Sequence, residues 1–445
     1  MNIKREILND LNRWKDSRYR KPLVLQGARQ VGKSHILKQF GLQCFDNCCY
    51  VNFDFEKEHK AEFAITKDPA RIVSYLSAVK GMDIKSEKTL IIFDEIQECN
   101  DALNSLKYFR ELMPEQAVVS AGSLLGVALK REGASFPVGN VDFMTLYPVS
   151  FEEFLVSYAE NLSQFLENYV LAKKLEKIPE IFHTQLIEAY KVYLCCGGMP
   201  ESIVRYLDNR DWNETDIINN QILTAYSLDF SKYIDSKDIP RLQRLWQNIQ
   251  DNLAKEERKF KYSLIEKNAR GREYENSVEW LVLSGLVNRI FEVSTLRLPL
   301  SSGKNSNAFK LYLSDSGLLR TKFQLTPATI LFGDRLFTEF KGILTENYVL
   351  QSLTRQFGND IFYWNSGNQA EIEFMFQLDE IIIPVETKSA LSIKSKSLSE
   401  YRKKYLPELS IRFSLKNVEK NNDLLNLPLY LADYTKDLIR ISLSC

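Results

Sequence analysis

The N-terminal part of the chain alternates short apolar runs with amphipathic stretches. Four apolar runs predict buried strands at Pro22–Gln26, Cys49–Phe53, Leu90–Phe93 and Ala117–Ala121. Apolar positions at helical spacing predict a short helix within residues 1–20 and further helices at Lys33–Phe40, Pro69–Val79 and Ala102–Leu112. Apolar strands that alternate with helices are typical of a parallel sheet covered on both faces, so we expect an α/β fold.

From Ser150 onward the pattern changes. Residues 151–238 are helix-rich and aromatic, contain no clear strand, and are interrupted by the turn sequence Gly197-Gly198-Met199-Pro200. Two helices and two strands are then predicted at Arg241–Leu253, Tyr274–Leu286, Val287–Val293 and Phe309–Leu313, with a polar hairpin tip at residues 301–307. Helices followed by a two-stranded hairpin predict a winged helix.

The last segment begins with a predicted helix and continues with strands. The helix is Leu336–Gln356, and the strands are Ile361–Trp364, Glu371–Phe376 and Ile381–Thr387. These changes of pattern predict four domains. They are a parallel-sheet core at residues 1–150, a helical lid at 151–240, a winged-helix-like domain at 241–325 and a C-terminal α/β domain at 326–445.

The segment after the first predicted strand fits the pattern G-x-x-x-x-G-K-[ST]. Its residues are Gly27, Ala28, Arg29, Gln30, Val31, Gly32, Lys33 and Ser34. The glycines let the backbone curl so that successive N–H groups face a phosphate, and the positive end of the next helix attracts the same charge. The lysine supplies a cation for the β- and γ-phosphates, and the serine supplies an oxygen for Mg²⁺. The loop therefore predicts a site for a purine nucleoside triphosphate, ATP with Mg²⁺.

Polar residues at the ends of two later strands complete this predicted site. Asp94 follows the apolar run Leu90–Phe93, and we expect it to hold Mg²⁺ through water. Glu95 is next to it, and we expect it to act as the general base on the attacking water. Ser123 follows the next strand, and we expect it, rather than Ser120, to contact the γ-phosphate.

Several short motifs occur in the same order in a known family. They are the loop at residues 27–34, Phe93-Asp94-Glu95-Ile96-Gln97, Ala121-Gly122-Ser123, Tyr147-Pro148-Val149-Ser150-Phe151-Glu152-Glu153-Phe154 and Gly197-Gly198-Met199-Pro200. In these motifs the chain resembles the prokaryotic AAA-type ATPases that carry a C-terminal domain of unknown function. The resemblance covers nearly the whole chain, and it implies an AAA-like P-loop core, a helical lid and ATP hydrolysis.

The resemblance also indicates where further cations are expected. Lys130 and Arg131 lie where AAA-type ATPases often carry an arginine finger, and an ordinary surface charge is the alternative. Family members often carry an arginine directly after the glycine that precedes the last core strand. Here Asn140 follows Gly139, which removes one candidate for contact with the γ-phosphate.

A second set of charged residues lies near the C-terminus. Glu346 lies on a predicted helix and Glu373 on a predicted strand. Glu386 and Lys388 are two residues apart at the end of the next predicted strand, so we expect their side chains to point the same way. This order resembles PD-(D/E)XK nucleases, in which two carboxylates hold Mg²⁺ and the lysine orients the attacking water. A hairpin with one solvated face also alternates acidic and apolar residues, so a purely structural role is the alternative.

The charges balance overall, with 58 Lys and Arg against 58 Asp and Glu, so a nucleic-acid partner requires a local patch. Residues 241–272 carry nine basic and four acidic side chains. Residues 394–404 carry five basic side chains and one acidic side chain. Both stretches are candidate DNA-binding surfaces, and a charged solvated face is the alternative.

Seven cysteines, no apolar run of about 20 residues and a charged start predict a cytoplasmic protein without membrane contact. The leading interpretation is an ATPase that moves or gates its C-terminal modules, with DNA as a possible substrate. The alternatives are an ATP-dependent switch that scaffolds a protein partner and an ATP-regulated, metal-dependent nuclease.

Overall fold

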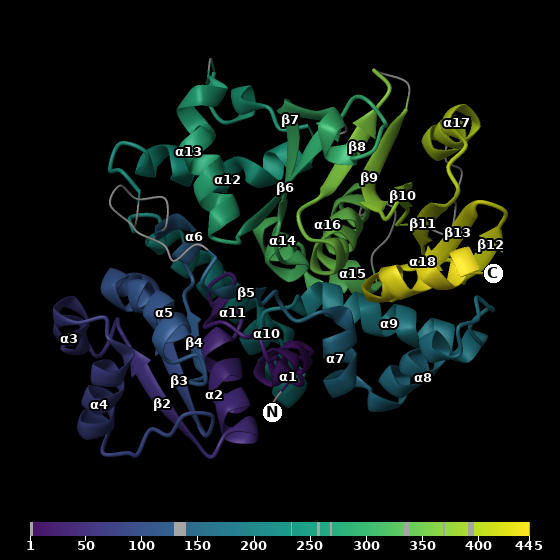
Figure 1. Cartoon of the computed structure of the whole chain (residues 1–445). Coiled ribbons are helices and arrows are strands. Elements are labelled where there is room, and N and C mark those ends of the chain that lie inside the picture. The colour runs from purple at the N-terminus through teal and green to yellow at the C-terminus, as the bar shows by residue number, and fades with distance from the viewer. Residues whose placement is uncertain are drawn as a thin grey trace.

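The structure is a computed structural model that describes residues 3–128, 139–232, 234–255, 259–267, 269–332, 338–367, 370–389 and 396–444. Within these residues the strands form one sheet of five strands and another of eight. Figure 1 shows the smaller sheet and its helices at the lower left and the larger sheet at the upper right, with helices between and below them.

The smaller sheet is parallel throughout, as the apolar runs predicted. Its strands are β1 (Leu23–Gln26), β2 (Asn47–Asn52), β3 (Thr89–Asp94), β4 (Val118–Ala121) and β5 (Asp142–Thr145), in the order β2-β3-β4-β1-β5. The helices of this part are α1 (Ile7–Asp16), α2 (Lys33–Cys44), α3 (His59–Ile65), α4 (Pro69–Lys80), α5 (Asn100–Leu112) and α6 (Leu125–Ala128).

Successive residues of the central strands point to opposite faces, and each face is buried by helices. Leu90 and Ile92 of β3 pack in one cluster with α1 and α2, and Ile91 and Phe93 pack in the other with α3, α4 and α5. Because all five carboxyl ends meet at one edge, the loops that follow the strands converge there.

Residues 151–229 are helical, as predicted. The helices are α7 (Phe151–Tyr158), α8 (Glu160–Leu171), α9 (Glu180–Cys196), α10 (Pro200–Asn209) and α11 (Trp212–Asp229). A capping box starts α7, in which the Ser150 side chain accepts from the Glu153 N–H and the Glu153 side chain accepts from the Ser150 N–H. Proline occupies the first turn of α10, where its missing N–H costs no helical hydrogen bond.

The larger sheet begins inside the segment predicted to be a winged helix. Its strands are β6 (Val287–Val293), β7 (Lys304–Leu313), β8 (Ile361–Asn365), β9 (Glu371–Leu378), β10 (Ile381–Thr387), β11 (Ser410–Ser414), β12 (Glu419–Asn421) and β13 (Leu424–Pro428), in the order β12-β13-β11-β10-β9-β8-β6-β7. The preceding helices, α12 (Ile239–Leu253) and α13 (Gly271–Leu283), agree with the prediction within a few residues.

The predicted winged helix is not confirmed, because its two strands do not form a free wing. β6 pairs in parallel with β8 at Phe291↔Phe362, so the C-terminal strands occupy the edge that a wing would leave open. The predicted polar tip is also partly wrong, since Lys304–Asn307 lie within β7. The sheet thus runs across the predicted boundary between residues 325 and 326, and the four-domain division stays a prediction.

The helices of this part are α14 (Ser316–Lys322), α15 (Pro327–Phe332), α16 (Thr338–Phe357), α17 (Lys396–Tyr405) and α18 (Thr435–Ser444). Of these, α16 and α17 cover opposite faces of the larger sheet. Tyr348 and Leu353 of α16 pack in one cluster with Phe374 of β9, whereas Leu398 and Tyr401 of α17 pack in another with Met375.

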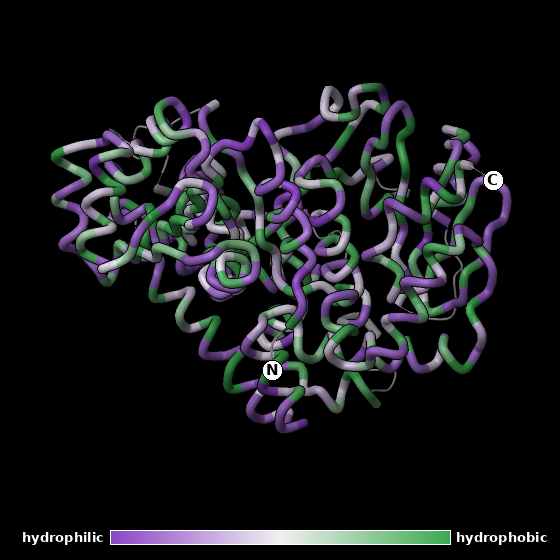
Figure 2. Tube along the Cα trace, turned by 60° about the horizontal axis from the view of Figure 1, so that its bottom comes forward, coloured by the Kyte–Doolittle hydropathy of each residue, from purple (hydrophilic) through white to green (hydrophobic). Residues whose placement is uncertain are grey.

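Hydrophobic and hydrophilic segments alternate along the trace in Figure 2. None of the described helices combines the length and the apolar character that crossing a membrane requires.

Candidate functional site

The predicted phosphate loop lies between β1 and α2, at the carboxyl edge of the smaller sheet. Gly27 has a φ of 144°, and a Cβ there would lie 2.2 Å from the carbonyl oxygen of Leu146. Gly32 has a φ of 95°, whereas a Cβ there would meet only Pro200, at 3.8 Å. At position 27 both the backbone conformation and the lack of space for a Cβ require glycine. At position 32 only the backbone conformation favours glycine. α2 starts directly after this curve, so its first N–H groups face the loop.

Lys33 holds its ammonium group over the loop. Its Nζ donates to the carbonyl oxygens of Gly27 at 2.9 Å and Ala28 at 2.7 Å. An ammonium group has three N–H bonds, so these two leave one for a phosphate oxygen. Burial lowers the pKa of Lys33 to about 8, although the nearby carboxylates of Glu95 and Asp94 oppose that shift. Lys33 is therefore mostly charged at neutral pH.

Asp94 ends β3 and is almost fully buried. Its Oδ2 accepts from the Tyr50 hydroxyl at 2.6 Å, and its Oδ1 accepts from the Glu95 N–H at 3.0 Å. Tyr50 lies on the neighbouring strand β2, where Asn52 is the residue paired with Asp94. Sequence reasoning missed Tyr50, because only the pairing of β2 with β3 brings its hydroxyl to Asp94.

Glu95 is held in a conformation that non-glycine residues rarely adopt, with a φ of 48°. The Gln97 side-chain amide donates to Glu95 Oε2 at 2.5 Å. A Cβ on Gly122, after β4, would lie 2.4 Å from Gln97 Oε1. The carboxylate of Glu95 is therefore fixed from the side of β4 and lies close enough to Lys33 to affect its pKa.

The two candidate serines after β4 differ in their hydrogen bonds. The Ser120 hydroxyl donates to the carbonyl oxygen of Leu23 at 3.1 Å. The Ser123 hydroxyl is buried and has no hydrogen-bond partner in the described part of the chain. This contrast favours the choice of Ser123 as the phosphate contact. The candidate arginine-finger positions, Lys130 and Arg131, lie outside the described residues.

Two contacts join the phosphate loop to α11. Arg29 forms an ion pair with Asp229 at the end of that helix, and the Tyr226 hydroxyl donates to the carbonyl oxygen of Arg29 at 2.9 Å. The next residue, Phe230, is fully buried, and its ring packs edge-on against Trp246 of α12. This stretch therefore connects the phosphate loop with α11 and α12.

The Gly197-Gly198 turn before α10 is fixed by Asp315. The Gly198 N–H donates to Asp315 Oδ2 at 2.5 Å, and the Leu318 N–H donates to Oδ1 at 2.8 Å. A Cβ on Gly197 would lie 2.4 Å from Asp315 Oδ1, so the turn requires a glycine there. Burial raises the pKa of Asp315 to about 6, against the three backbone N–H groups that it accepts from.

Three of the four predicted C-terminal residues come together. Lys388 Nζ lies 3.1 Å from Glu386 Oε1 and 3.8 Å from Glu373 Oε1, and Arg412 Nε donates to Glu386 Oε2 at 3.2 Å. Burial raises the pKa of Glu373 to about 7, which Lys388 opposes and Glu386 reinforces. Two cations thus balance these carboxylates across three neighbouring strands.

The fourth residue, Glu346, accepts from the Tyr312 hydroxyl of β7 at 3.3 Å. Among the described residues no group of three or more His, Cys, Asp or Glu side chains is arranged to hold a metal ion. The nuclease chemistry stays a prediction.

The two basic stretches are partly neutralised. Arg241 pairs with Asp238, Arg244 with Glu266, and Arg402 with Asp423. Arg258 and Lys394, which were counted in these stretches, lie outside the described residues.

Comparison with known families gives three matches. Residues 19–155 match the family described as AAA domain. Residues 187–329 and 341–430 match two families described as Domain of unknown function, DUF8612 and DUF4143. The first match supports the expected AAA-type P-loop core, and the other two describe no activity.

Solved structures with low similarity also match. The Walker-type ATPase PABY2304 of Pyrococcus abyssi has a TM-score of 0.41 and 15% identity, and the match covers 72% of this chain and 96% of that one. The Aeropyrum pernix ORC2 protein, in ADPNP–ADP complexes, has a TM-score of 0.36 and 11% identity, with 73% and 94% covered. The AMPPCP-bound DnaA from Aquifex aeolicus has a TM-score of 0.26 and 14% identity, with 62% and 81% covered. No curated protein matches the chain.

Proposed function

We propose that the chain binds ATP with Mg²⁺ at residues 27–34 and hydrolyses it. The observation that carries this proposal is that Lys33, Glu95 and Ser123 follow the neighbouring strands β1, β3 and β4 at one edge of the parallel sheet, and that the buried Ser123 hydroxyl has no partner among the described residues. A buried hydroxyl without a partner is costly in free energy, and a phosphate oxygen would satisfy it. The AAA-domain match at residues 19–155 supports the same activity.

Each residue has a role in this proposal. The N–H groups of the curved loop and of the first turn of α2 bind the phosphates, with the remaining N–H of Lys33. Ser34 and Asp94 offer the oxygen ligands that Mg²⁺ prefers, so the residues present fit this ion. Bound Mg²⁺ would neutralise charge that develops on the phosphates. Glu95, oriented by Gln97, accepts the proton of the attacking water.

Movement of the appended modules is the second part of the proposal. The loop contacts α11 through Arg29 and Asp229, and Gly32 lies beside Pro200 at the start of α10. A change in loop conformation on binding or release of nucleotide would act on both helices directly. ATP turnover then repositions residues 151–240 and the segments packed on them.

Phosphate release by Glu95→Gln tests the catalytic assignment. Glutamine keeps the shape but removes the base, so we expect kcat to fall by about 10²-fold or more while ATP still binds. Glu98→Gln is the matched control, because Glu98 ends the short 3-10 helix Ile96–Glu98 that directly follows Glu95, and it pairs with Lys60 at 3.8 Å. Equal turnover in the Glu95 and Glu98 variants would contradict the proposal.

DNA is the first partner to test, because of the basic stretches at residues 241–272 and 394–404. Turnover should be measured with duplex and with single-stranded DNA at several salt concentrations. Stimulation that weakens as salt rises would support DNA as the partner. Turnover independent of both DNAs would leave a protein partner as the alternative.

A further inference from the structure

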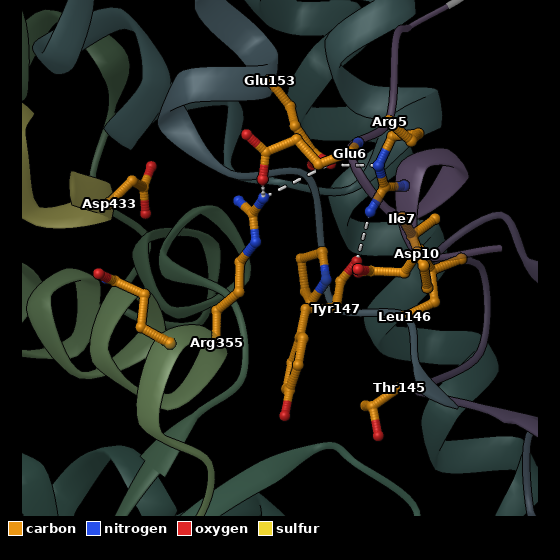
Figure 3. A pocket seen from close by; sticks show the side chains of 12 residues that line it. Arg5, Glu6, Ile7, Asp10, Thr145, Leu146, Tyr147, Glu153, Arg355 and Asp433 are labelled. Atoms are coloured by element: carbon orange, nitrogen blue, oxygen red, sulfur yellow. Dashed lines mark hydrogen bonds and ion pairs between the residues drawn. The ribbon is translucent and has the colours of Figure 1, made fainter. Parts of the chain in front are cut away.

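Three segments far apart in the sequence meet at a small charged cavity. It has a volume of about 230 Å³, and the residues before α1, the start of α7 and the end of α16 contribute Arg5, Glu6, Glu153 and Arg355 to its lining. Figure 3 shows the two arginines approaching from opposite sides, with the two glutamates between them. The catalytic proposal uses none of these residues.

Arg5 contacts the phosphate loop directly. Its Nη1 donates to the carbonyl oxygen of Val31 at 3.0 Å, its Nη2 to the carbonyl oxygen of Tyr147 at 2.6 Å, and its Nε to Glu153 Oε2 at 3.1 Å. The side chain is 7% exposed, so these three acceptors take the place of water around the guanidinium. Val31 is the loop residue before Gly32, and it is fully buried.

The bond to Val31 fixes the direction of a loop N–H group. In a trans peptide unit the C=O and the following N–H point in opposite directions. The Val31 carbonyl points toward the guanidinium of Arg5, so the N–H of Gly32, in the same peptide unit, points away from Arg5. N–H groups presented together by a curved backbone form a site for phosphate oxygens.

Glu153 connects Arg5 with the C-terminal segment. Its Oε2 also accepts from the Ser150 N–H at 3.1 Å, and its Oε1 accepts from the Glu6 N–H at 2.8 Å. The guanidinium of Arg355, on α16, lies 3.7 Å from the same Oε1 and forms an ion pair with Glu6. One buried carboxylate therefore joins α16, the segment before α1 and the start of α7.

We propose that Arg5 is a positioning residue that keeps the phosphate loop curved, and that Arg355 stabilises Arg5 through Glu153 and Glu6. The end of α16 is then linked to the nucleotide site by direct contacts. The link to ATP rests on the proposed function, whereas the effect of Arg5 on the loop does not.

Arg5→Lys tests the positioning role. Lysine keeps the positive charge but lacks the planar fork that reaches three acceptors in three directions. We expect the amides of residues 27–34 to exchange hydrogen about tenfold faster without nucleotide, the effect of losing one charge-assisted hydrogen bond. We also expect the KM for ATP to rise more than kcat falls. Arg20→Gln is the matched control, because Arg20 donates to two carbonyl oxygens, of Lys15 and Glu115, away from the loop.

Arg355→Gln tests the link to α16 without altering Arg5. We expect a smaller but measurable increase in exchange of the same amides, and none in Arg20→Gln. Wild-type exchange of residues 27–34 in folded Arg5→Lys would overturn the positioning role. If amide exchange is faster in Arg5→Lys but unchanged in Arg355→Gln, α16 has no part in holding the loop. A wild-type protein that binds no ATP would contradict the proposed function, but the exchange of the loop amides would still decide the role of Arg5.

Discussion

Ser120 and Ser123 are close in sequence and are both buried, yet their hydroxyl groups have different surroundings. Ser120 is satisfied by the carbonyl oxygen of Leu23 on the adjacent strand. The hydroxyl of Ser123 has no partner among the described residues, at the sheet edge where the phosphate loop and Glu95 meet. Its burial is consistent with a role that requires a ligand.

Alanine substitutions at the two serines should therefore have opposite effects. Ser123→Ala removes an unsatisfied hydroxyl, so we expect the melting temperature to stay unchanged or rise slightly, while kcat falls by about 10²-fold. Ser120→Ala removes a satisfied hydrogen bond and should cost about 1 kcal/mol of unfolding free energy, with kcat unchanged. Thermal melts and phosphate release on both variants check this. A large loss of stability in Ser123→Ala would indicate a structural hydroxyl instead.

Among single residues, the sequence predicted those that belong to a motif of consecutive positions. The loop and Asp94-Glu95 could be found because spacing along the chain carries the signal. Tyr50, Arg5 and Asp315 could not be found, because each acts on a residue that is distant in sequence. Only strand pairing and helix packing bring their side chains to Asp94, Val31 and Gly198.

Helix starts determine how the elements around the site are connected. α10 starts beside the phosphate loop, and its preceding turn is held by Asp315, which also caps the N-terminus of α14 through Leu318. One carboxylate thus sets the ends of two helices from different parts of the sequence.

Asp315→Ala should affect both stability and nucleotide affinity. It leaves the N–H groups of Gly198 and Leu318 without their acceptor, at a cost of about 1–3 kcal/mol for each. α10 would then move relative to Gly32, so we expect weaker ATP binding as well as a lower melting temperature. Asp211→Ala is the matched control, because Asp211 caps the N-terminus of α11 in an exposed position. If Asp315→Ala has reduced stability but wild-type affinity for ATP, the turn before α10 does not influence nucleotide binding.

The apolar pattern predicted β1–β4 of the smaller sheet and both strands of the hairpin of β6 and β7, but it did not predict which strand pairs with the outer edge of that hairpin. The runs that form β3 and β4 are almost entirely apolar, so their composition already predicts that both faces of each strand are buried. A hairpin gives no such indication of what pairs with its outer edge. The pairing of Phe291 with Phe362 spans a long stretch of chain, and local pattern contains no information about it.

At the scale of the whole molecule, the N-terminal segment, α7 and the C-terminal residues form one charged junction. Burial and the charge of Glu6, with a further contribution from Asp433, raise the pKa of Glu152 to about 10, against the opposing charge of Arg355. The Glu152 N–H donates to Asp433 Oδ2 at 3.1 Å. In the folded chain Glu152 and its neighbour Glu6 therefore retain a shared proton to higher pH than an isolated glutamate would.

The stability of the whole chain should depend on pH through this group. The ordinary pKa of glutamate is 4.5, so between that value and about 10 the unfolded chain has released a proton that the folded chain retains. The contribution of Glu152 to stability thus falls as pH rises through this range. Glu152→Gln removes the dependence, so we expect its melting temperature to exceed that of the wild type by an amount that grows from pH 5 to pH 9. A difference that is constant with pH would contradict this assignment.

The central claim is that residues 27–34 bind ATP with Mg²⁺. Titration calorimetry of Mg²⁺·ATP into the wild-type chain and Lys33→Ala, with folding verified by a thermal melt, tests it most directly. We predict saturable heat for the wild type that is lost in Lys33→Ala, because the alanine removes the cation held over the loop. No heat from the folded wild-type chain, or equal heat from both proteins, would contradict the claim.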